Sequence, residues 1–407
     1  MSGTDDQFVV RLVNASFVNF TDSTTPFAPA PWLARFAKFV VFMLFVLIMI
    51  GGHTTTSGAG MAFPDWPLSS GSLNPDGWWE NFMERLEHGH RLTAEAVALL
   101  IGVLCAWVWQ SKWSIPIALA VSLTLTVGAK LSGAERSVIA HTGLWSAAIT
   151  FALAILSKAH RGDLARPPAI RWIAFAAFLG VLVQAIMGGF RVTIEAGGDP
   201  AFATAFRVAH GCFAHLEFSL VVTLAAMLSP VWPQLRSMVG GRSVAVLGWI
   251  TAVFLFLQLL VGATMRHLGA GLAIPSWPQV TPAGSLLPEI HNRFIDLNFT
   301  HTRIGAIIAT LLVVSLALRA IGHAAGEVRI IRPAALLVAL VAAQFTLGLL
   351  VIWKMRPPVI TTLHVVNGAA LLATTVLLAL RAGRSGRLQA AQAFPTQAAV
   401  SPPEVSA

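Results

Sequence analysis

The segment GAGMAFPDWP at residues 58–67 returns as GAGLAIPSWP at residues 269–278. Each copy follows an apolar segment that ends in Gly and Thr, and each precedes a segment with a His near its start. A match this specific is not a product of apolar composition alone. It predicts two tandem halves of like topology, as in membrane proteins built from parallel repeats.

The composition around these repeats is that of a polytopic membrane protein. Hydrophobic residues make up 56% of the 407 residues and charged residues only 11%, whereas soluble chains carry about 25% charged residues. The net charge of +9 does not indicate nucleic-acid binding, because Lys and Arg of membrane proteins collect on the cytoplasmic side. The two cysteines, Cys105 and Cys212, lie inside apolar segments and do not indicate a disulfide framework.

A spanning helix needs roughly 20 apolar residues, and the sequence predicts ten, at about 36–52, 88–109, 114–131, 138–157, 172–189, 205–228, 244–265, 294–319, 333–353 and 361–381. The start of the chain is acidic and polar, so the first apolar segment is expected to be a retained helix. Basic residues gather in three loops and the tail, all on the side of the N-terminus. We therefore expect both termini in the cytoplasm.

The tandem repeat aligns two histidines of the first half with two of the second. His90 aligns with His301, and His210 aligns with His364. All four are expected in the first turn or two of a helix that enters from the outer leaflet. Ionisable residues inside a membrane are functional candidates by default. A single such His often serves only to hydrogen-bond two helices together, but two symmetry-related pairs make that alternative much weaker.

Paired imidazoles at membrane depth suit haem better than zinc. Zinc usually takes three or four N, S or carboxylate ligands, whereas two His from facing helices suit the axial positions of a haem iron. Arg91, Arg207 and Arg303 lie near these His and are candidates for contacts with haem propionates. Their alternative role is to extend toward the membrane interface. The pattern predicts one haem site in each half.

The two halves differ at one chemically important position. Glu87 stands three residues before His90, whereas Asn298 stands three residues before His301. This spacing places each residue on the same helix face as its His. A carboxylate there can take or give a proton, although an acid at a helix start is also favoured by the helix dipole alone. We expect the chemistry in the first half and a cofactor site in the second.

These residues together resemble the heme A synthase family. The resemblance rests on SGAGMAFPDWPLSSG (57–71), on EHGHR (87–91) and on tandem halves with one His pair each, and it covers most of the chain. It implies two four-helix bundles, each with a haem between two His. It also implies oxidation of a ring methyl of heme O to a formyl group by successive hydroxylations, with heme A as product and haem b as electron carrier.

The resemblance also implies roles for single residues and partners. His90 and His210 would bracket the substrate haem, with Glu87 as the catalytic acid, and His301 and His364 would ligate haem b. The expected location is a bacterial plasma (inner) membrane. Expected partners are membrane lipid, cytochrome oxidase assembly factors and a heme O synthase (protohaem farnesyltransferase) as donor, with a homo-oligomer as a further option.

Two departures from the family pattern stand out. Some members carry a Cys pair in the first outer loop, where this chain has Phe63 and Ser69. The interval from His90 to His210 is also 57 positions longer than that from His301 to His364, which is enough for an inserted helical hairpin at 114–157. The expected divisions are a cytoplasmic segment 1–35, a first bundle 36–228 with this hairpin, a second bundle 244–381 and a disordered cytoplasmic tail 382–407.

Several alternatives remain at this stage. His141, in the inserted hairpin, is a second candidate for the place of His210, which the repeat favours. A dihaem cytochrome acting on quinone would show the same four His but would not need Glu87. A transporter is a third option, although the polar groups cluster at one leaflet. Roles beyond the pairs are expected as follows: His88 none, His215 a partner behind His210, His53 and His267 in outer loops near the haem edges, His160 and His323 in cytoplasmic loops, and His291 in solvent.

Overall fold

The computed structural model describes residues 30–158 and 166–393. It is all-helical, and in this described part ten helical segments are long and apolar enough to cross a membrane, which confirms the predicted number. The helices are α2 Pro31–Thr56, α3 Phe82–Val108, α4 Ser114–Leu131, α5 Arg136–Leu156, α6 Pro168–Ala196, α7 Pro200–Met227, α8 Gly241–His267, α9 Arg293–Phe299, η2 Thr300–Gly305, α10 Ala306–His323, α11 Val328–Trp353 and α12 Pro358–Ala393. α9, η2 and α10 form one continuous span.

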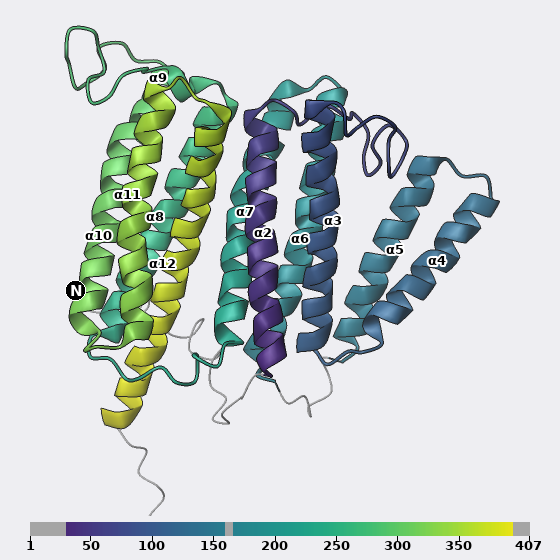
Figure 1. The fold of residues 1–407 in the computed structure, drawn as a ribbon, viewed down its shortest axis with the longest axis horizontal. Coiled ribbons are helices and arrows are strands. Elements are labelled where there is room, and N and C mark those ends of the chain that lie inside the picture. Colours follow the sequence, from purple (N-terminus) through teal and green to yellow (C-terminus); the bar gives the residue numbers. More distant parts are fainter. Residues whose placement is uncertain (1–29, 159–165, 394–407) are drawn as a thin grey trace, which may run out of the picture.

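The spans pack as two groups of four (Figure 1). In the first group, α2 packs on α3 and α7, and α6 packs on α3 and α7. In the second group, α8 packs on α10 and α12, and α11 packs on the same two helices. The groups meet where α12 lies against α2 and α7, and where α7 lies against α8. We call this contact the seam.

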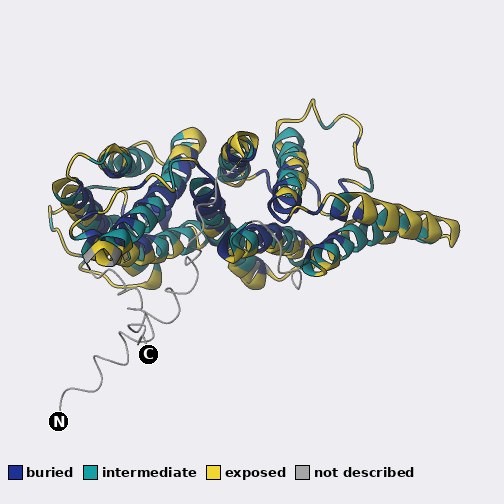
Figure 2. Cartoon of the chain, turned by 90° about the horizontal axis from the view of Figure 1, so that it is seen from below, coloured by how far each residue is buried: buried dark blue, intermediate teal, exposed yellow. Residues whose placement is uncertain are grey.

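The hairpin of α4 and α5 stands at the edge of the first group. Its two helices pack mainly on one another and project from the side of the molecule (Figures 1 and 2). α4 buries only Ser114 and Ala118, while Leu119 and Leu123 remain 60% and 66% exposed. These side chains are suited to contact lipid. The hairpin is therefore an addition to the first group and not a part of its interior.

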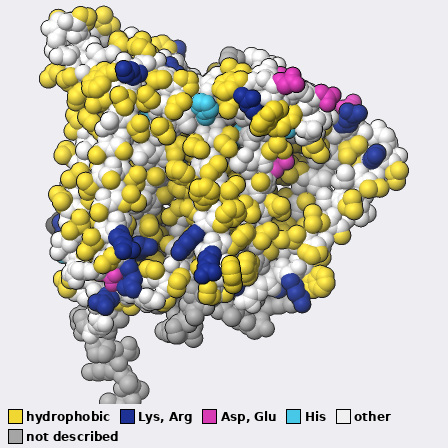
Figure 3. Space-filling model, viewed as in Figure 1, with side chains coloured by type: hydrophobic (Ala, Val, Ile, Leu, Met, Phe, Trp, Pro, Cys, Tyr) yellow, Lys and Arg dark blue, Asp and Glu magenta, His cyan; other side chains and the backbone are white. Residues whose placement is uncertain are grey.

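The surface fits a bilayer. Hydrophobic side chains cover the middle of the molecule, and charged side chains lie mostly toward its two ends (Figure 3). The loops at residues 57–81 and 268–292 both lie at one end, uppermost in Figure 1, which we call the loop end. Both groups direct their repeated segment to this end.

Asparagine caps fix the depth of the first His in each group. Asn81 precedes α3, and its side chain accepts hydrogen bonds from the backbone N–H groups of residues 83 and 84. Asn292 precedes α9 and accepts from the N–H groups of residues 294 and 295. Such caps satisfy N–H groups left free at a helix start. Each cap stands nine residues before its His, so His90 and His301 lie in the third turn, slightly deeper than expected.

Several predicted boundaries are wrong. α2 begins at Pro31 and not at residue 36, and α3 begins at Phe82 and not at residue 88. α6 ends at Ala196 and not at residue 189, and α12 continues to Ala393 through part of the expected disordered tail. Small residues explain the longer helix, because the backbones of Gly241 and Gly386 approach closely and Ser385 is fully buried. The Ser385 carbonyl also accepts from the backbone N–H of Met238. The expectations for residues 1–29, His160 and residues 394–407 lie outside the described residues.

Candidate functional site

The first His of each pair packs on a glycine of the preceding helix. A Cβ added to Gly51 of α2 would lie 2.7 Å from Cε1 of His90. A Cβ added to Gly262 of α8 would lie 2.4 Å from Cε1 of His301. These distances are shorter than a real side chain tolerates, so both rings occupy space that only glycine leaves. The two glycines are equivalent in the repeat, seven residues before Gly58 and Gly269.

The second His of each pair also packs on a glycine of a neighbouring helix, but at a longer distance. A Cβ at Gly188 of α6 would lie 3.5 Å from Cε1 of His210, and one at Gly348 of α11 would lie 3.3 Å from Cε1 of His364. All four imidazoles are thus seated on the glycine of a neighbouring helix in the same group. This fourfold arrangement supports the alignment of the two halves.

The structure brings the predicted partners together. His90 and His210 interact electrostatically, as do His301 and His364. Nδ1 of His90 and Nδ1 of His364 are buried without a hydrogen-bond partner. Within the described ranges, no three residues among His, Cys, Asp and Glu gather as a metal site. Two imidazoles from different helices are the ligand set of a haem iron with two axial His.

Amide side chains contact two of the four rings, and a third, Gln258, donates to the backbone carbonyl of His301. Each stands four residues before the glycine just described: Gln184, Gln258 and Gln344. The Gln184 amide lies 2.8 Å from Nδ1 of His210, and Gln344 Nε2 lies 3.2 Å from Nε2 of His364. On α2 the same place holds Leu47. His90 is therefore the ring of the four whose glycine-bearing neighbour brings no amide.

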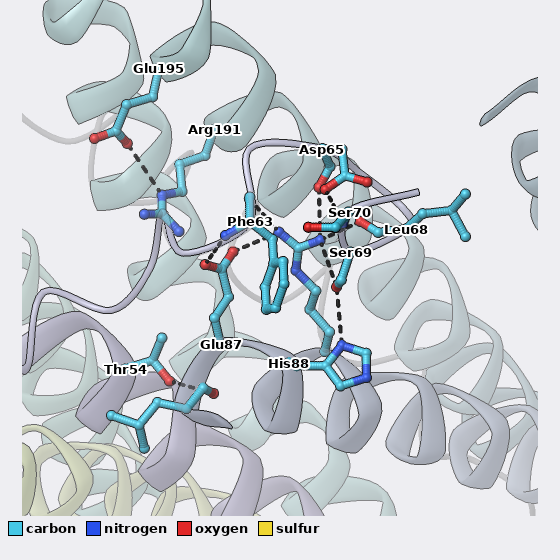
Figure 4. A network of polar contacts seen from close by, with 12 residues as sticks. Thr54, Phe63, Asp65, Leu68, Ser69, Ser70, Glu87, His88, Arg191 and Glu195 are labelled. Atoms are coloured by element: carbon cyan, nitrogen blue, oxygen red, sulfur yellow. Dashed lines mark hydrogen bonds and ion pairs between the residues drawn. The ribbon is translucent and has the colours of Figure 1, made fainter. Parts of the chain in front are cut away.

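Glu87 is buried inside a polar network at the loop end of α3 (Figure 4). It is 3% exposed, so it is not the solvated helix-start residue of the alternative interpretation. Its Oε1 lies 2.6 Å from Nη2 of Arg91, and its Oε2 accepts a hydrogen bond of 3.0 Å from the backbone N–H of Phe63. Arg191 of α6 also acts electrostatically on Glu87. The carboxylate is held from three directions.

Arg91 binds the first loop, a role that the sequence analysis did not assign to it. Its Nη1 donates to the backbone carbonyls of Asp65 at 2.7 Å and Leu68 at 2.6 Å, and its Nη2 donates to that of Phe63 at 2.9 Å. These bonds and the Glu87 pair occupy the hydrogens of both terminal nitrogens. Arg91 thus fixes residues 63–68 over the first group.

Arg303 does the same in the second group. Its Nη2 donates to the carbonyls of Ser276 and Gln279, which correspond in the repeat to those of Asp65 and Leu68. Its Nη1 lies 3.3 Å from Oδ1 of Asn298. The terminal nitrogens of Arg303 thus serve the loop and neighbouring side chains, while its Nε is buried without a hydrogen-bond partner.

A π-helical turn reconciles the different spacing of these arginines. Arg91 stands one residue after His90, but Arg303 stands two residues after His301. Residues Thr300–Gly305 form a π-helix, η2, which accommodates one extra residue per turn. The extra residue brings Arg303 to the loop carbonyls that Arg91 reaches in the first group.

Arg207 pairs with an acid of α6. Its Nη1 lies 2.8 Å from Oε1 of Glu195. Arg191, three residues beyond Gly188 on α6, lies 3.6 Å from the same carboxyl group (Figure 4). The sequence analysis missed Arg191. The signal was its position one turn from a glycine that supports a His ring.

His88 has a structural role that the sequence analysis did not assign. It is 3% exposed, its Nδ1 lies 3.0 Å from the Ser69 hydroxyl, and its ring contacts Trp78 edge-on at 4.7 Å. It therefore anchors the far end of the first loop. His141 contacts Trp66 at 5.3 Å, and its Nδ1 faces the Ser137 carbonyl.

Other histidines lie at or near the seam. Nδ1 of His215 faces the Gly211 carbonyl at 2.7 Å, and its Nε2 faces the Val365 carbonyl of the second group at 3.4 Å. His53 and His267 lie in the last turns of α2 and α8, not in loops. His291 is exposed and pairs with an aspartate, as expected of a solvent-facing residue.

The sequence analysis also missed Glu217, a carboxyl group in the interior of α7. It is 3% exposed, and its Oε1 is buried without a hydrogen-bond partner. A Cβ at Gly180 of α6 would lie 1.9 Å from its Oε2, so glycine makes room for this carboxyl. A single acid inside an apolar segment was the available signal.

The fold and the site define a ten-helix membrane protein with two facing His pairs. The chain belongs to the cytochrome oxidase assembly protein family COX15-CtaA, whose model matches residues 136–376, a range that includes His210, His301 and His364. This confirms the family expected from the sequence.

Curated relatives extend the similarity beyond that range. The heme A synthase of Symbiobacterium thermophilum is 25% identical over 288 residues, covering 67% of this chain and 71% of that protein. The heme A synthase of Geobacillus kaustophilus is 22% identical over 347 residues, covering 84% and 90%. The heme A synthase of Brucella ovis is 32% identical over 88 residues, covering 19% and 25%.

Proposed function

We propose that this protein is a heme A synthase. It oxidises a ring methyl of heme O to a formyl group by successive hydroxylations, with haem b as electron carrier. The family match and the named relatives support this activity. The substrate haem is assigned to His90 and His210, and haem b to His301 and His364.

The residues present fit a haem in each group. Each pair offers imidazoles from two helices, seated on glycines that leave no competing side chain. Two of the four rings present a buried, unpartnered Nδ1. When bound, the haem supplies the redox-active iron and the ring methyl to be oxidised. The chain supplies axial nitrogens, apolar walls and the polar network at the loop end.

Glu87 is the observation that supports a reaction in the first group. Arg91 and the Phe63 N–H each bind one of its oxygens, so the chain holds this carboxyl group at a fixed place. A fixed carboxylate can accept a proton during oxidation. The equivalent Asn298 donates from Nδ2 to the Ala270 carbonyl at 2.9 Å. An amide with that bond supports the loop but takes no proton.

Extraction of the pigments from the purified protein tests this assignment. Heme O or heme A is expected together with haem b. Haem b in both sites, with no heme O or heme A after expression beside a heme O synthase, would instead identify a dihaem cytochrome that exchanges electrons with quinone.

The cellular setting follows from the same proposal. The protein is placed in a bacterial plasma membrane with both termini in the cytoplasm and the haem sites near the outer leaflet. A heme O synthase is its donor, and cytochrome oxidase assembly factors receive its product. Membrane lipid surrounds it, and self-association is a further option. Protease accessibility of tags at both termini in spheroplasts tests the orientation.

A further inference from the structure

A cavity of about 250 Å³ lies where the two groups meet at the loop end. Both groups contribute to its lining. Arg191 and Arg207 come from α6 and α7 of the first group, and Arg266 and Arg356 come from α8 and the turn after α11 of the second. We call this cavity the seam pocket. No residue of the two His pairs lines it.

The seam pocket carries more positive charge than its own acids balance. Glu195 is the one carboxylate in its lining, and it pairs with both Arg191 and Arg207. In the described part of the chain, neither Arg266 nor Arg356 lies within ion-pair distance of a carboxylate. Glu87 acts on Arg191 but is already paired with Arg91. Partly buried cations without counter-charges are costly, so this lining is built for an anion.

Unused donors support the same conclusion. Nε of Arg207 is buried without a hydrogen-bond partner. Nε of Arg191 also makes no hydrogen bond, because it lies 3.6 Å from Oε2 of Glu195. Arg266 donates from Nη2 to the Gly52 carbonyl at the long distance of 3.4 Å. Guanidinium groups bind carboxylates and phosphates with two parallel hydrogen bonds. The donors match an acidic ligand group.

The position of the pocket indicates which acidic group it receives. In the first group, Arg207 stands three residues before His210, and Arg191 stands three residues after Gly188, which supports the His210 ring. Both residues therefore lie about 4.5 Å, nearly one helical turn, nearer the loop end along their helices. Acidic arms of a disc held at His210 would therefore meet them.

The second group repeats this offset. Arg266 stands four residues after Gly262, which supports the His301 ring. Thr361, which also lines the pocket, stands three residues before His364. The pocket thus lies one turn beyond both His pairs. Its volume is below the roughly 300–1,000 Å³ of sites that enclose a whole ligand, so it suits the arms of two ligands and not a third ligand.

We propose that the seam pocket is a shared carboxylate site, in which the acidic side arms of the tetrapyrroles of both groups meet, held by Arg191 and Arg207 on one side and by Arg266 and Arg356 on the other. This inference rests on the proposed function, because it requires a haem in each group. It assigns to the pocket a role that neither His pair has, which is to fix the two ligands relative to one another.

Esterified haem tests the contact directly. The full chain, freed of haem in detergent, is titrated with protohaem or with protohaem dimethyl ester, and the dissociation constant is taken from the absorption of the bis-His complex. One arm uses His301→Ala/His364→Ala, which leaves the first site. The other uses His90→Ala/His210→Ala, which leaves the second. Each of these two double variants therefore reports the ligand carboxylates bound in one helix group alone.

Each arm should prefer the free acid over the ester by roughly ten-fold, the effect of about one charge-assisted hydrogen-bonded pair. Arg191→Gln with Arg207→Gln should remove the preference in the first arm. Arg266→Gln with Arg356→Gln should remove it in the second. Arg293→Gln, an exposed arginine outside the pocket, should leave it intact. If a Gln variant does not fold, Arg207→Lys can be used instead. Lysine keeps the positive charge but cannot form two parallel hydrogen bonds, so the preference for the free acid over the ester should fall in part.

Equal binding of acid and ester by the unsubstituted arginines would overturn the inference. So would a preference that survives the substitutions, or arginine variants that weaken both ligands alike, as expected if the pocket binds phosphate or only supports the fold. In these cases a bis-His absorption spectrum in both arms would leave the proposed function standing. Absence of that spectrum in both arms would overturn both proposals.

Discussion

Oε1 of Glu87 lies 2.6 Å from Nη2 of Arg91, one turn apart on α3. In the second group the corresponding contact joins Oδ1 of Asn298 to Nη1 of Arg303 at 3.3 Å, across five residues of a π-helical turn. Both arginines hold equivalent loop carbonyls. The two sites therefore share one scaffold, and a single carboxylate distinguishes the first from the second.

Glu87→Gln tests that distinction. The amide keeps the size of the side chain but cannot accept a proton as a carboxylate does. We expect conversion of heme O to heme A to fall by roughly 10²- to 10⁴-fold, the range for a lost acid–base group, with unchanged haem content. Pigment extraction after expression measures both quantities. Glu80→Gln, at an exposed position before α3, is the control. Wild-type heme A yield from the Glu87 variant would refute its catalytic role.

His301→Ala tests the ligands of the second group. Loss of this imidazole leaves one axial nitrogen, so haem b should be lost from that site while the first site keeps its haem. The haem-to-protein ratio and the split of the haem absorption bands report this. His291→Ala removes an exposed histidine just before the same span and should change neither. Unchanged haem b in the His301 variant would exclude this residue as a ligand.

Gly262→Ala tests whether the ring needs the glycine beneath it. The added Cβ would lie 2.4 Å from Cε1 of His301, so the ring must move and haem b affinity should drop. Gly322→Ala lies in the same helix group but has open space around the added Cβ, so it should leave haem b affinity unchanged. Alanine favours the helix in both variants, so the comparison isolates the steric effect. Equal haem affinity in the two variants would contradict the packing argument.

Arg91→Gln tests the support of the first loop. The change removes donors to the carbonyls of Asp65, Leu68 and Phe63 and leaves buried Glu87 without its counter-charge. Breaking a buried pair in this way costs about 3–5 kcal/mol. A lower temperature of thermal inactivation in detergent is therefore expected, with faster proteolysis within residues 57–81. Arg85→Gln, whose guanidinium is near the protein surface, serves as the control.

Much of this organisation was predictable, because it depends on local patterns of the sequence. Apolar length gave the ten spans, and the tandem repeat paired His90 with His210 ahead of His141. The longer interval between the first pair correctly indicated an inserted hairpin. These features depend on residues close together in the chain or on a comparison of its two halves.

The remaining features depend on packing between distant segments. The seam brings together three arginines from the two helix groups: Arg191, Arg266 and Arg356. No residue spacing in the sequence predicts that contact between the groups. The sequence predicted no role for His88, because this residue lies on a different helix face from His90. In the structure, the first loop covers it. The continuation of α12 beyond residue 381 likewise depends on contact of Gly386 with Gly241.

The π-helical turn of the second group has a consequence for how relatives should be compared. An ungapped alignment of the two halves pairs Arg91 with Thr302, although Arg303 performs the same task. The π-helical turn accommodates the one extra residue between His301 and Arg303. In any homologue, the arginine that fastens this loop should therefore be sought at either of two distances from its histidine, and an apparent loss at one of them can be a displacement.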